Sequence, residues 1–226
     1  MRGREVSRIE GFSDAAFGFA LTLLVVSLEV PRDFDALRAT LAGFLPFAAT
    51  FAIVSWIWFE HYLFFRRFGL QDGLTVVLNC SLLFVVLFFV YPLKFVFDLI
   101  LSGGAAGWSA IGPGGARMLM LVYGGGFIAV FAALALLYSH ARRQRAVLGL
   151  SALEAFDAGA GCRRHLLSVG VGMASVALAA TLPVEMLWVS GVLYGLLGPV
   201  HFTNGLLTGR ARERLQAPLS SRPAPR

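Results

Sequence analysis

The chain has 226 residues, of which 58% are hydrophobic and only 14% are charged, and its mean hydropathy is +0.75. This composition excludes a soluble globular domain, in which about a quarter of the residues carry a charge. The formal net charge is +6, but the basic residues cluster between apolar runs and form no module of the kind that reads nucleic acid. We therefore expect an integral membrane protein whose cationic clusters face anionic lipid headgroups.

Six apolar runs are long enough to cross about 30 Å of hydrocarbon as helices. Continuous apolarity, rather than alternation of apolar and polar residues, favours helices over a barrel. The expected spans are residues 12–30, 39–65, 74–97, 116–139, 166–182 and 184–207. The first run is too long for a signal-peptide core and should be retained. The sequence therefore predicts one all-α, six-helix domain over residues 1–210.

The distribution of basic residues predicts the orientation of these spans. If the N-terminus is cytosolic, all but four of the 19 basic residues fall in cytosolic segments. The exceptions are Arg32, Arg38, Lys94 and Arg117. We therefore expect both termini to be cytosolic and the protein to reside in the cell inner membrane.

Several connections have their own expected form. The glycine- and serine-rich segment 98–114 should be irregular. Ser151 and Glu154 have the capping-box spacing, so a short interfacial helix should begin there. The tail, residues 211–226, holds three prolines and should be disordered and cytosolic. Cys80 and Cys162 lie in a span and a cytosolic loop, so neither a disulfide framework nor a metal site is expected.

The first span divides into an apolar stripe and a polar side. At about 100° per residue one stripe contains Phe12, Phe19, Leu23, Val26 and Val30. Ser13 and Asp14 point away from this stripe, and Thr22 lies at its flank. The stripe either lines a pore or faces lipid or another helix, and periodicity alone does not decide between these interpretations.

Polar residues of the second and third spans should lie at the depth of Asp14. Trp58 and His61 lie near the cytosolic end of the second span, and Asn79 lies near the start of the third. A buried carboxylate needs hydrogen-bond donors, which His61, Asn79, the Trp58 ring and Arg8 could supply. The network either holds the helices together or acts as a hinge or proton sensor, with His61 as the titrating member.

Glycines recur in the last three spans, and Gly191 and Gly195 have a spacing that lets helix backbones approach closely. We interpret these glycines as packing positions, either within one protomer or between protomers. His201 and Asn204 are expected to be hydrogen-bond partners rather than ligands.

The first 95 residues resemble the bacterial branch of the lysosomal/endosomal potassium-channel family. The resemblance rests on Arg-x-x-x-Phe-Ser-Asp at residues 8–14, on Thr22-Leu23-Leu24 and Pro31, on Trp58-x-x-His61, and on Asn79 with Pro92. It implies a homotetramer in which the first helices surround a central pore. It also implies that the pore lacks a carbonyl-type filter and that apolar side chains at Phe19, Leu23 and Val26 make its constriction.

The resemblance also assigns roles to the polar positions. Thr22 would contribute to potassium preference, and Phe12, Ser13 and Asp14 with His61 and Asn79 would hold the first helix. Phe19 departs from the family, which usually has Ile or Leu there, and Gly18 replaces the usual Ala. Four phenyl rings could seal such a pore more completely or turn their faces to a cation. No cofactor is expected beyond the permeant K⁺.

Two other classes of function remain open from the sequence. A proton-coupled secondary transporter would use Asp14 and His61 as a relay, although such folds usually contain broken helices and the first span shows no break. A non-conducting structural or lipid-binding protein would have Phe19 as a permanent plug. An intramembrane enzyme is disfavoured, because no signature of an oxyanion hole or substrate cleft accompanies Ser13, Asp14 and His61.

Overall fold

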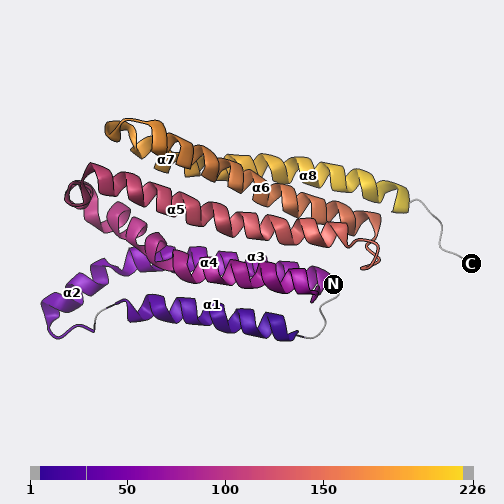
Figure 1. Cartoon of the computed structure of the whole chain (residues 1–226), viewed down its shortest axis with the longest axis horizontal. Coiled ribbons are helices and arrows are strands. Elements are labelled where there is room, and N and C mark those ends of the chain that lie inside the picture. Colours follow the sequence, from indigo (N-terminus) through magenta and orange to yellow (C-terminus); the bar gives the residue numbers. More distant parts are fainter. Residues whose placement is uncertain (1–5, 29, 221–226) are drawn as a thin grey trace, which may run out of the picture.

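The computed structural model describes residues 6–28 and 30–220, which form a bundle of long helices (Figure 1). The main helices are α1 (Arg8–Val26), α2 (Phe34–Ala42), α3 (Phe44–Phe68), α4 (Gly73–Asp98), α5 (Gly104–Arg143), α6 (Ala152–Thr181), α7 (Trp188–Val192) and α8 (Leu197–Ser220). Short turns of other helix types complete the chain: η1 (Leu99–Gly103), η2 (Val184–Met186) and η3 (Leu193–Leu196). No strand occurs among these residues.

Six helical stretches are long and apolar enough to cross a membrane, so the expected all-α, multi-pass architecture is confirmed. They are Arg8–Val26, Phe44–Phe68, Gly73–Leu101, Gly107–Arg143, Ala152–Thr181 and Val184–Gln216. α1 begins and α8 ends at the same end of the bundle (Figure 1).

The boundaries of the first two expected spans differ from the structure. The first helix covers Arg8–Val26 instead of 12–30, and Ser27 is its C-cap. The second expected span, 39–65, is divided between α2 and α3, with a break at Gly43. Pro46 lies in the first turn of α3, where its missing N–H costs no hydrogen bond, so the chain begins a new helix there.

The connections are more helical than expected. Segment 98–114 is not irregular: η1 leads into α5, whose one non-helical residue is Gly112, with φ 65° and ψ 175°. The capping box of Ser151 and Glu154 is present, but it opens the full 30 residues of α6 rather than a short interfacial helix. No proline interrupts the chain between these residues and the fifth apolar run, so one helix continues through both.

The last span is one helical stretch, Val184–Gln216, as the sequence suggested. Its first part changes between helix types, because η2, α7 and η3 precede α8, and Gly191 and Gly195 fall in this part. The expected disordered tail is wrong over 211–220, because α8 continues to Ser220. Arg, Glu, Leu, Gln and Ala in this segment are good helix formers. The rest of that tail lies outside the described residues.

Close packing between the central helices depends on four glycines. A Cβ added to Gly126 would lie 2.3 Å from Phe89, one at Gly124 or Gly161 would lie 2.4 Å from Val176 or Tyr138, and one at Gly172 would lie 2.8 Å from Ile128. In contrast, a Cβ at Gly191 or Gly195 would meet nothing within 4 Å. The expected close approach at these two residues is therefore not made within the protomer.

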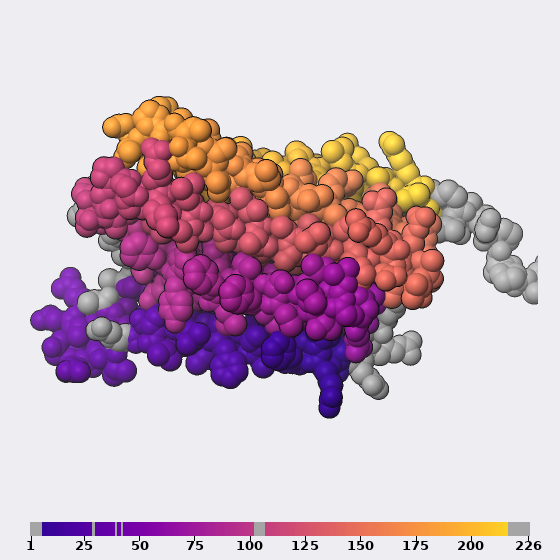
Figure 2. Space-filling view, in the orientation of Figure 1, coloured from indigo at the N-terminus to yellow at the C-terminus, as the bar shows by residue number. Residues whose placement is uncertain are grey.

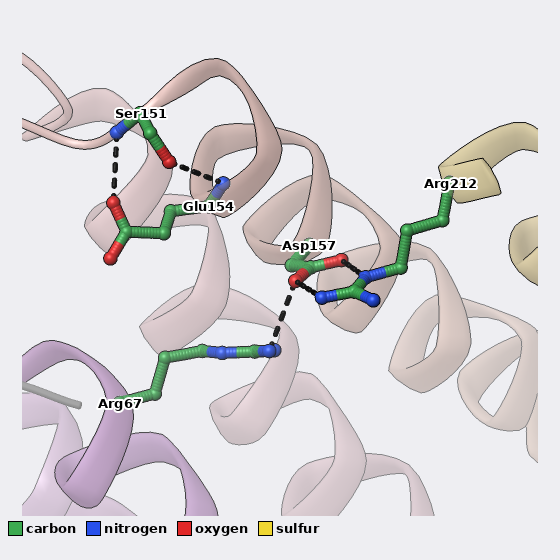
Figure 3. Close-up of polar contacts among 5 residues, drawn as sticks. All are labelled: Arg67, Ser151, Glu154, Asp157 and Arg212. Carbon is green, nitrogen blue, oxygen red and sulfur yellow. Dashed lines mark hydrogen bonds and ion pairs between the residues drawn. The ribbon is translucent and has the colours of Figure 1, made fainter. Parts of the chain in front are cut away.

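One acidic residue connects three helices at the end of the bundle where α1 begins. Asp157 of α6 accepts hydrogen bonds from Arg67 of α3 at 3.0 Å and from Nε of Arg212 of α8 at 3.2 Å (Figure 3). The carboxylate is 9% exposed, whereas both arginine side chains are about two-fifths exposed. The clustered arginines are therefore partly neutralised by a carboxylate that ties α3, α6 and α8 together.

Candidate ion pathway

α1 forms one long edge of the molecule, and the segment containing α7 and α8 forms the opposite edge (Figure 2). Within the chain α1 packs mainly against α3 and α4. Its buried residues are Glu10, Ser13, Phe17, Ala20 and Leu24. These positions recur every three or four residues, which places them on one helix face. α1 is thus attached along a single face.

The other face of α1 is apolar and uncovered by the rest of the chain. Phe12 is 61% exposed, Phe19 67%, Leu23 40% and Val26 72%. Thr22 lies beside them, also exposed, and its hydroxyl donates to the carbonyl of Gly18 at 2.8 Å. Val30, the last member of the predicted stripe, lies beyond the end of α1. The other members form an exposed surface that needs a partner outside the protomer or faces lipid.

A chain of buried hydrogen bonds holds the N-terminal half of α1. His61 Nε2 lies 2.7 Å from Asn79 Oδ1, Asn79 Nδ2 donates to Ser13 Oγ at 2.9 Å, and Ser13 Oγ donates to the carbonyl of Ile9 at 2.7 Å. His61, Asn79 and Ser13 are each at most 1% exposed. Three helices are thereby joined by polar groups that no water reaches.

The direction of these hydrogen bonds determines the tautomer of His61. The proton of Ser13 Oγ is used on the Ile9 carbonyl, so Asn79 must present its amide nitrogen to Ser13 and its oxygen to His61. His61 Nε2 must then carry a proton. Nδ1 of His61 is buried and has no hydrogen-bond partner among the described residues. A proton on Nδ1 would therefore be a buried donor without an acceptor. The neutral ring, protonated only on Nε2, avoids this and fits the site.

Asp14 does not join this chain, contrary to the expectation that it is buried against His61 and Asn79. The residue is exposed, and its Oδ1 accepts from Trp58 Nε1 at 2.8 Å. Because one residue turns a helix by about 100°, Asp14 follows buried Ser13 onto a different face. Arg8 is exposed, and within the described part of the chain it forms no ion pair with Asp14.

The opposite end of α1 is held by a cation that the sequence did not assign to it. Lys94 Nζ of α4 donates to Ser27 Oγ at 2.8 Å and lies 3.4 Å from the Ser27 carbonyl oxygen. A positive charge at a helix C-terminus interacts favourably with the helix dipole. The only sequence signal was that Lys94 is one of four basic residues outside the expected cytosolic segments.

The comparison with known sequences covers almost the whole chain. Residues 8–89 match the family described as endosomal/lysosomal potassium channel TMEM175. A protein of Marivirga tractuosa named potassium channel is 36% identical over 227 residues, which cover 95% of this chain and 92% of that relative. The chain belongs to the TMEM175 family.

Solved TMEM175 structures share the fold. The crystal structure of a variant of the potassium channel MtTMEM175, in complex with a nanobody fusion protein, matches 92% of this chain and 96% of that chain, with a TM-score of 0.82 and 36% identity. A protein from Chamaesiphon minutus, described as a homologue of the lysosomal potassium-selective channel TMEM175, has a TM-score of 0.58 and 24% identity over 89% of this chain. The second likeness concerns the fold alone.

TMEM175 proteins are potassium channels and not enzymes, so the chain is not an enzyme. Among the described residues, no group of three or more His, Cys, Asp or Glu side chains is placed to hold a metal ion. Both cysteines, Cys80 and Cys162, are free.

The sequence analysis did not identify the residues by which α1 of this TMEM175 protein packs against α3 and α4. Phe17, Ala20 and Leu24 are at most 2% exposed. They continue the spacing of Ser13 at intervals of three or four residues, so the same periodicity that revealed the stripe could have identified them. Glu10 was also missed: it forms a capping box with Ser7 at the start of α1.

Proposed function

We propose that the protein is a potassium-permeable channel in which four copies of α1 surround a central pore. The observation that carries the proposal is the division of α1 into two faces. One face is anchored to α3 and α4 by buried residues, whereas the other presents Phe12, Phe19, Leu23 and Val26 with nothing of the same chain against them. Membership of a family of potassium channels supports the same function.

In such an assembly apolar rings would control the passage of ions. A narrow apolar constriction excludes water, and a cation cannot cross without its hydration shell. Phe12 and Phe19 have the largest side chains of the stripe. Phe19, which lies midway along α1, would form the tightest ring, with Leu23 and Val26 following toward the C-terminal end of the helix. Thr22 would offer its hydroxyl oxygen beside the ring, since the hydroxyl proton is already used on the Gly18 carbonyl.

The polar contacts of α1 would keep these rings in register. His61 and Asn79 hold Ser13, and Trp58 holds Asp14, so rotation of α1 about its axis would break several hydrogen bonds together. Selectivity for K⁺ would be moderate, because few oxygen atoms replace the hydration shell. The permeant ion is the only small molecule required, and the expected location is the bacterial inner membrane.

The decisive experiment is K⁺ flux through the purified protein in liposomes, before and after Phe19→Ala. Removing four phenyl rings widens and wets the constriction, so K⁺ flux should rise several-fold and discrimination against Na⁺ should fall. The matched control is Phe202→Ala on α8, which is 68% exposed at the opposite edge of the protomer. This control should conduct like the parent.

Two outcomes would reject the proposal. Equal effects of Phe19→Ala and Phe202→Ala would remove Phe19 from the pathway. Flux that saturates with K⁺ and requires a proton gradient would favour the transporter alternative, in which Asp14 and His61 act as a relay.

A further inference from the structure

The edge of the protomer away from α1 contains a large apolar cavity. It has a volume of about 690 Å³ and is lined by residues of η1, the start of α5, and the η2–α7 segment, including Trp108, Ala116, Met120, Val184 and Gly191. The kink of α5 at Gly112 and Pro113 forms part of its wall. Trp188 and Val192, also in the lining, are 66% and 63% exposed, so the cavity opens to the surroundings.

A second apolar cavity continues the first into the protomer. It has a volume of about 300 Å³ and shares Ile100, Met120 and Gly191 with the first cavity. Its lining follows α5 inward through Tyr123 and Phe127. A smaller apolar cavity in a protein stays dry and takes up apolar molecules, so water is a poor occupant for this one.

The combined cavity runs along a membrane-spanning part of α5. After the kink at Gly112 and Pro113 its lining on α5 extends from Ala116 to Phe131, over which the helix rises about 22 Å at 1.5 Å per residue. This rise is shorter than a hydrocarbon core about 30 Å thick. The lining of the open cavity belongs to the spans Gly73–Leu101, Gly107–Arg143 and Val184–Gln216, so we expect lipid at its opening.

A cation is a chain neighbour of the lining, although it is not itself part of it. Arg117 directly follows the lining residue Ala116, and its guanidinium donates to the carbonyls of Ala180 and Leu182 at 2.9 and 2.8 Å. Leu182 precedes the lining residue Val184 by two positions. Among the described residues no carboxylate forms an ion pair with Arg117, and a guanidinium has five N–H donors. Its charge is complementary to a phosphate group.

We propose that this cavity is a phospholipid site, in which Arg117 binds the phosphate and one acyl chain extends past Gly191 into the protomer between α3, α4 and α5. The lining includes η2 and α7, which lie at the edge opposite α1 (Figure 1). The choice of a lipid over a second copy of the chain rests on the proposed function, in which α1 faces the other subunits. The bound chain fills space that would otherwise leave the lining residues without contacts.

Gly191→Leu tests the site, because an added Cβ there meets no atom within 4 Å and a leucine would fill the junction of the two cavities. Gly195→Leu is the matched control, since Gly195 has equal space and lines neither cavity. Each protein is reconstituted in palmitoyl-oleoyl phosphatidylglycerol vesicles and extracted into detergent. Retained phospholipid per chain is then counted by native mass spectrometry.

The parent and Gly195→Leu should retain one phospholipid per chain, and Gly191→Leu should retain at least fivefold less. Arg117→Gln should lower retention from phosphatidylglycerol and from phosphatidylcholine vesicles alike, because both carry the phosphate. If Gly191→Leu fails to fold, Ala116→Phe, which narrows the same cavity, takes its place.

Equal retention by the two leucine variants, or a parent that retains no lipid, would overturn the site. Dissociation of the oligomer by Gly191→Leu alone would also overturn it and assign the cavity to a neighbouring subunit. Lipid retention is measured without ion flux, so the site and the proposed conduction can fail independently.

Discussion

Asn79 holds the polar chain beneath α1 together, because it both donates to Ser13 and accepts from His61. Asn79→Leu keeps the size of the side chain but leaves the buried His61 donor unpaired. Each unsatisfied buried group costs about 1–3 kcal/mol, so we expect a loss of free energy of unfolding in that range. The measurement is thermal unfolding of the detergent-purified protein.

The matched control for Asn79→Leu is Ser81→Ala on the same helix, where an exposed hydroxyl bonds only the carbonyl of Val77. This control should leave the unfolding temperature nearly unchanged. Similar losses in both variants would show that the polar chain contributes little to stability.

For single residues, the sequence predicted which side chains come together better than it predicted the direction in which each side chain points. Ser13, His61 and Asn79 could be grouped because they occupy similar depths in their predicted spans. The prediction for Asp14 was wrong because its exposure depends on which face of α1 meets α3 and α4. Consecutive residues are rotated by about 100° around a helix axis, so Asp14 is exposed although Ser13 is buried. The bond from Lys94 to Ser27 depends on how two helices pack, which no local pattern encodes.

The packing of α4 against α5 depends on a single missing side chain. Gly126→Ala would place a Cβ 2.3 Å from the ring of Phe89, which is 3% exposed and has little room to move. Overpacking of a core costs about 1–3 kcal/mol, more than the gain of up to about 1 kcal/mol from the better helix propensity of alanine. We expect lower stability in a thermal or denaturant unfolding assay.

Gly170→Ala provides the comparison, because an added Cβ there meets nothing within 4 Å and only the propensity term remains. This variant should be as stable as the parent or slightly more stable. If Gly126→Ala behaves in the same way, α4 and α5 do not approach as closely as described.

The start of α4 depends on Asp72, which lies between α3 and α4. Its carboxylate caps the N–H groups of Leu74 and Thr75 and lies 3.0 Å from His140 Nε2 of α5. Partial burial would raise the pKa of Asp72, but hydrogen bonds from His140 and Thr75 outweigh it and lower this pKa to about 2. Asp72→Ala should lower the free energy of unfolding by about 1 kcal/mol at neutral pH.

The lowered pKa of Asp72 also determines how this contribution varies with pH. Because the pKa of Asp72 is lower in the folded protein than in the unfolded chain, its carboxylate stabilises the fold fully when the pH is above the unfolded-state pKa near 3.8. This stabilisation is lost as the pH falls toward the folded-state pKa of about 2. Unfolding curves of the parent and of Asp72→Ala should therefore converge between about pH 4 and pH 2. A difference that is constant across this range would contradict the role of the charge.

Individual helices could be predicted where the local signal was strong. The capping box at Ser151 was confirmed because hydrogen bonds between residues three apart do not depend on the rest of the fold. The break at Gly43 and the change of helix type in η2, α7 and η3 were not predicted, because the apolarity of a run does not indicate where its helix ends or changes its winding. The helical continuation to Ser220 was missed because the prolines outweighed the helix formers before them.

Asp157 determines how the bundle closes at the end where the arginines gather. Asp157→Asn removes the charge that Arg67 and Arg212 share. A hydrogen bond to a charged group contributes about 1.5–3 kcal/mol, and the exposure of both arginines places the expected loss at the lower limit. The check is the unfolding temperature at low and high salt, which should differ less in the variant than in the parent.

Glu213→Gln removes a charge from an exposed position on α8 and is the control for Asp157→Asn. It should leave both the stability and its salt dependence close to those of the parent. A parent that is itself insensitive to salt would show that the contact of Asp157 with two arginines is energetically neutral.

For the whole molecule, composition and charge predicted the number of spans and the all-α class. They did so because the bilayer imposes a length and a polarity on every helix that crosses it. The polar residues grouped the first three spans, but most other neighbours, such as α5 between α4 and α6, were beyond the sequence. The cavity beside Gly191 illustrates the reason, since it forms where the kink in α5 meets the η2–α7 segment far along the chain.

α1 has two polar attachments and an apolar stretch between them. Asp14 and Ser27 mark their positions, about 20 Å apart at 1.5 Å per residue, and among the described residues no side-chain hydrogen bond joins α1 to another helix between them. Apolar contacts are non-directional, so this middle section can shift sideways without breaking a side-chain hydrogen bond, while Phe17, Ala20 and Leu24 limit how far it moves. Phe19 lies within this section, so in the proposed channel the pore would widen by bending of the four α1 helices rather than by their rotation.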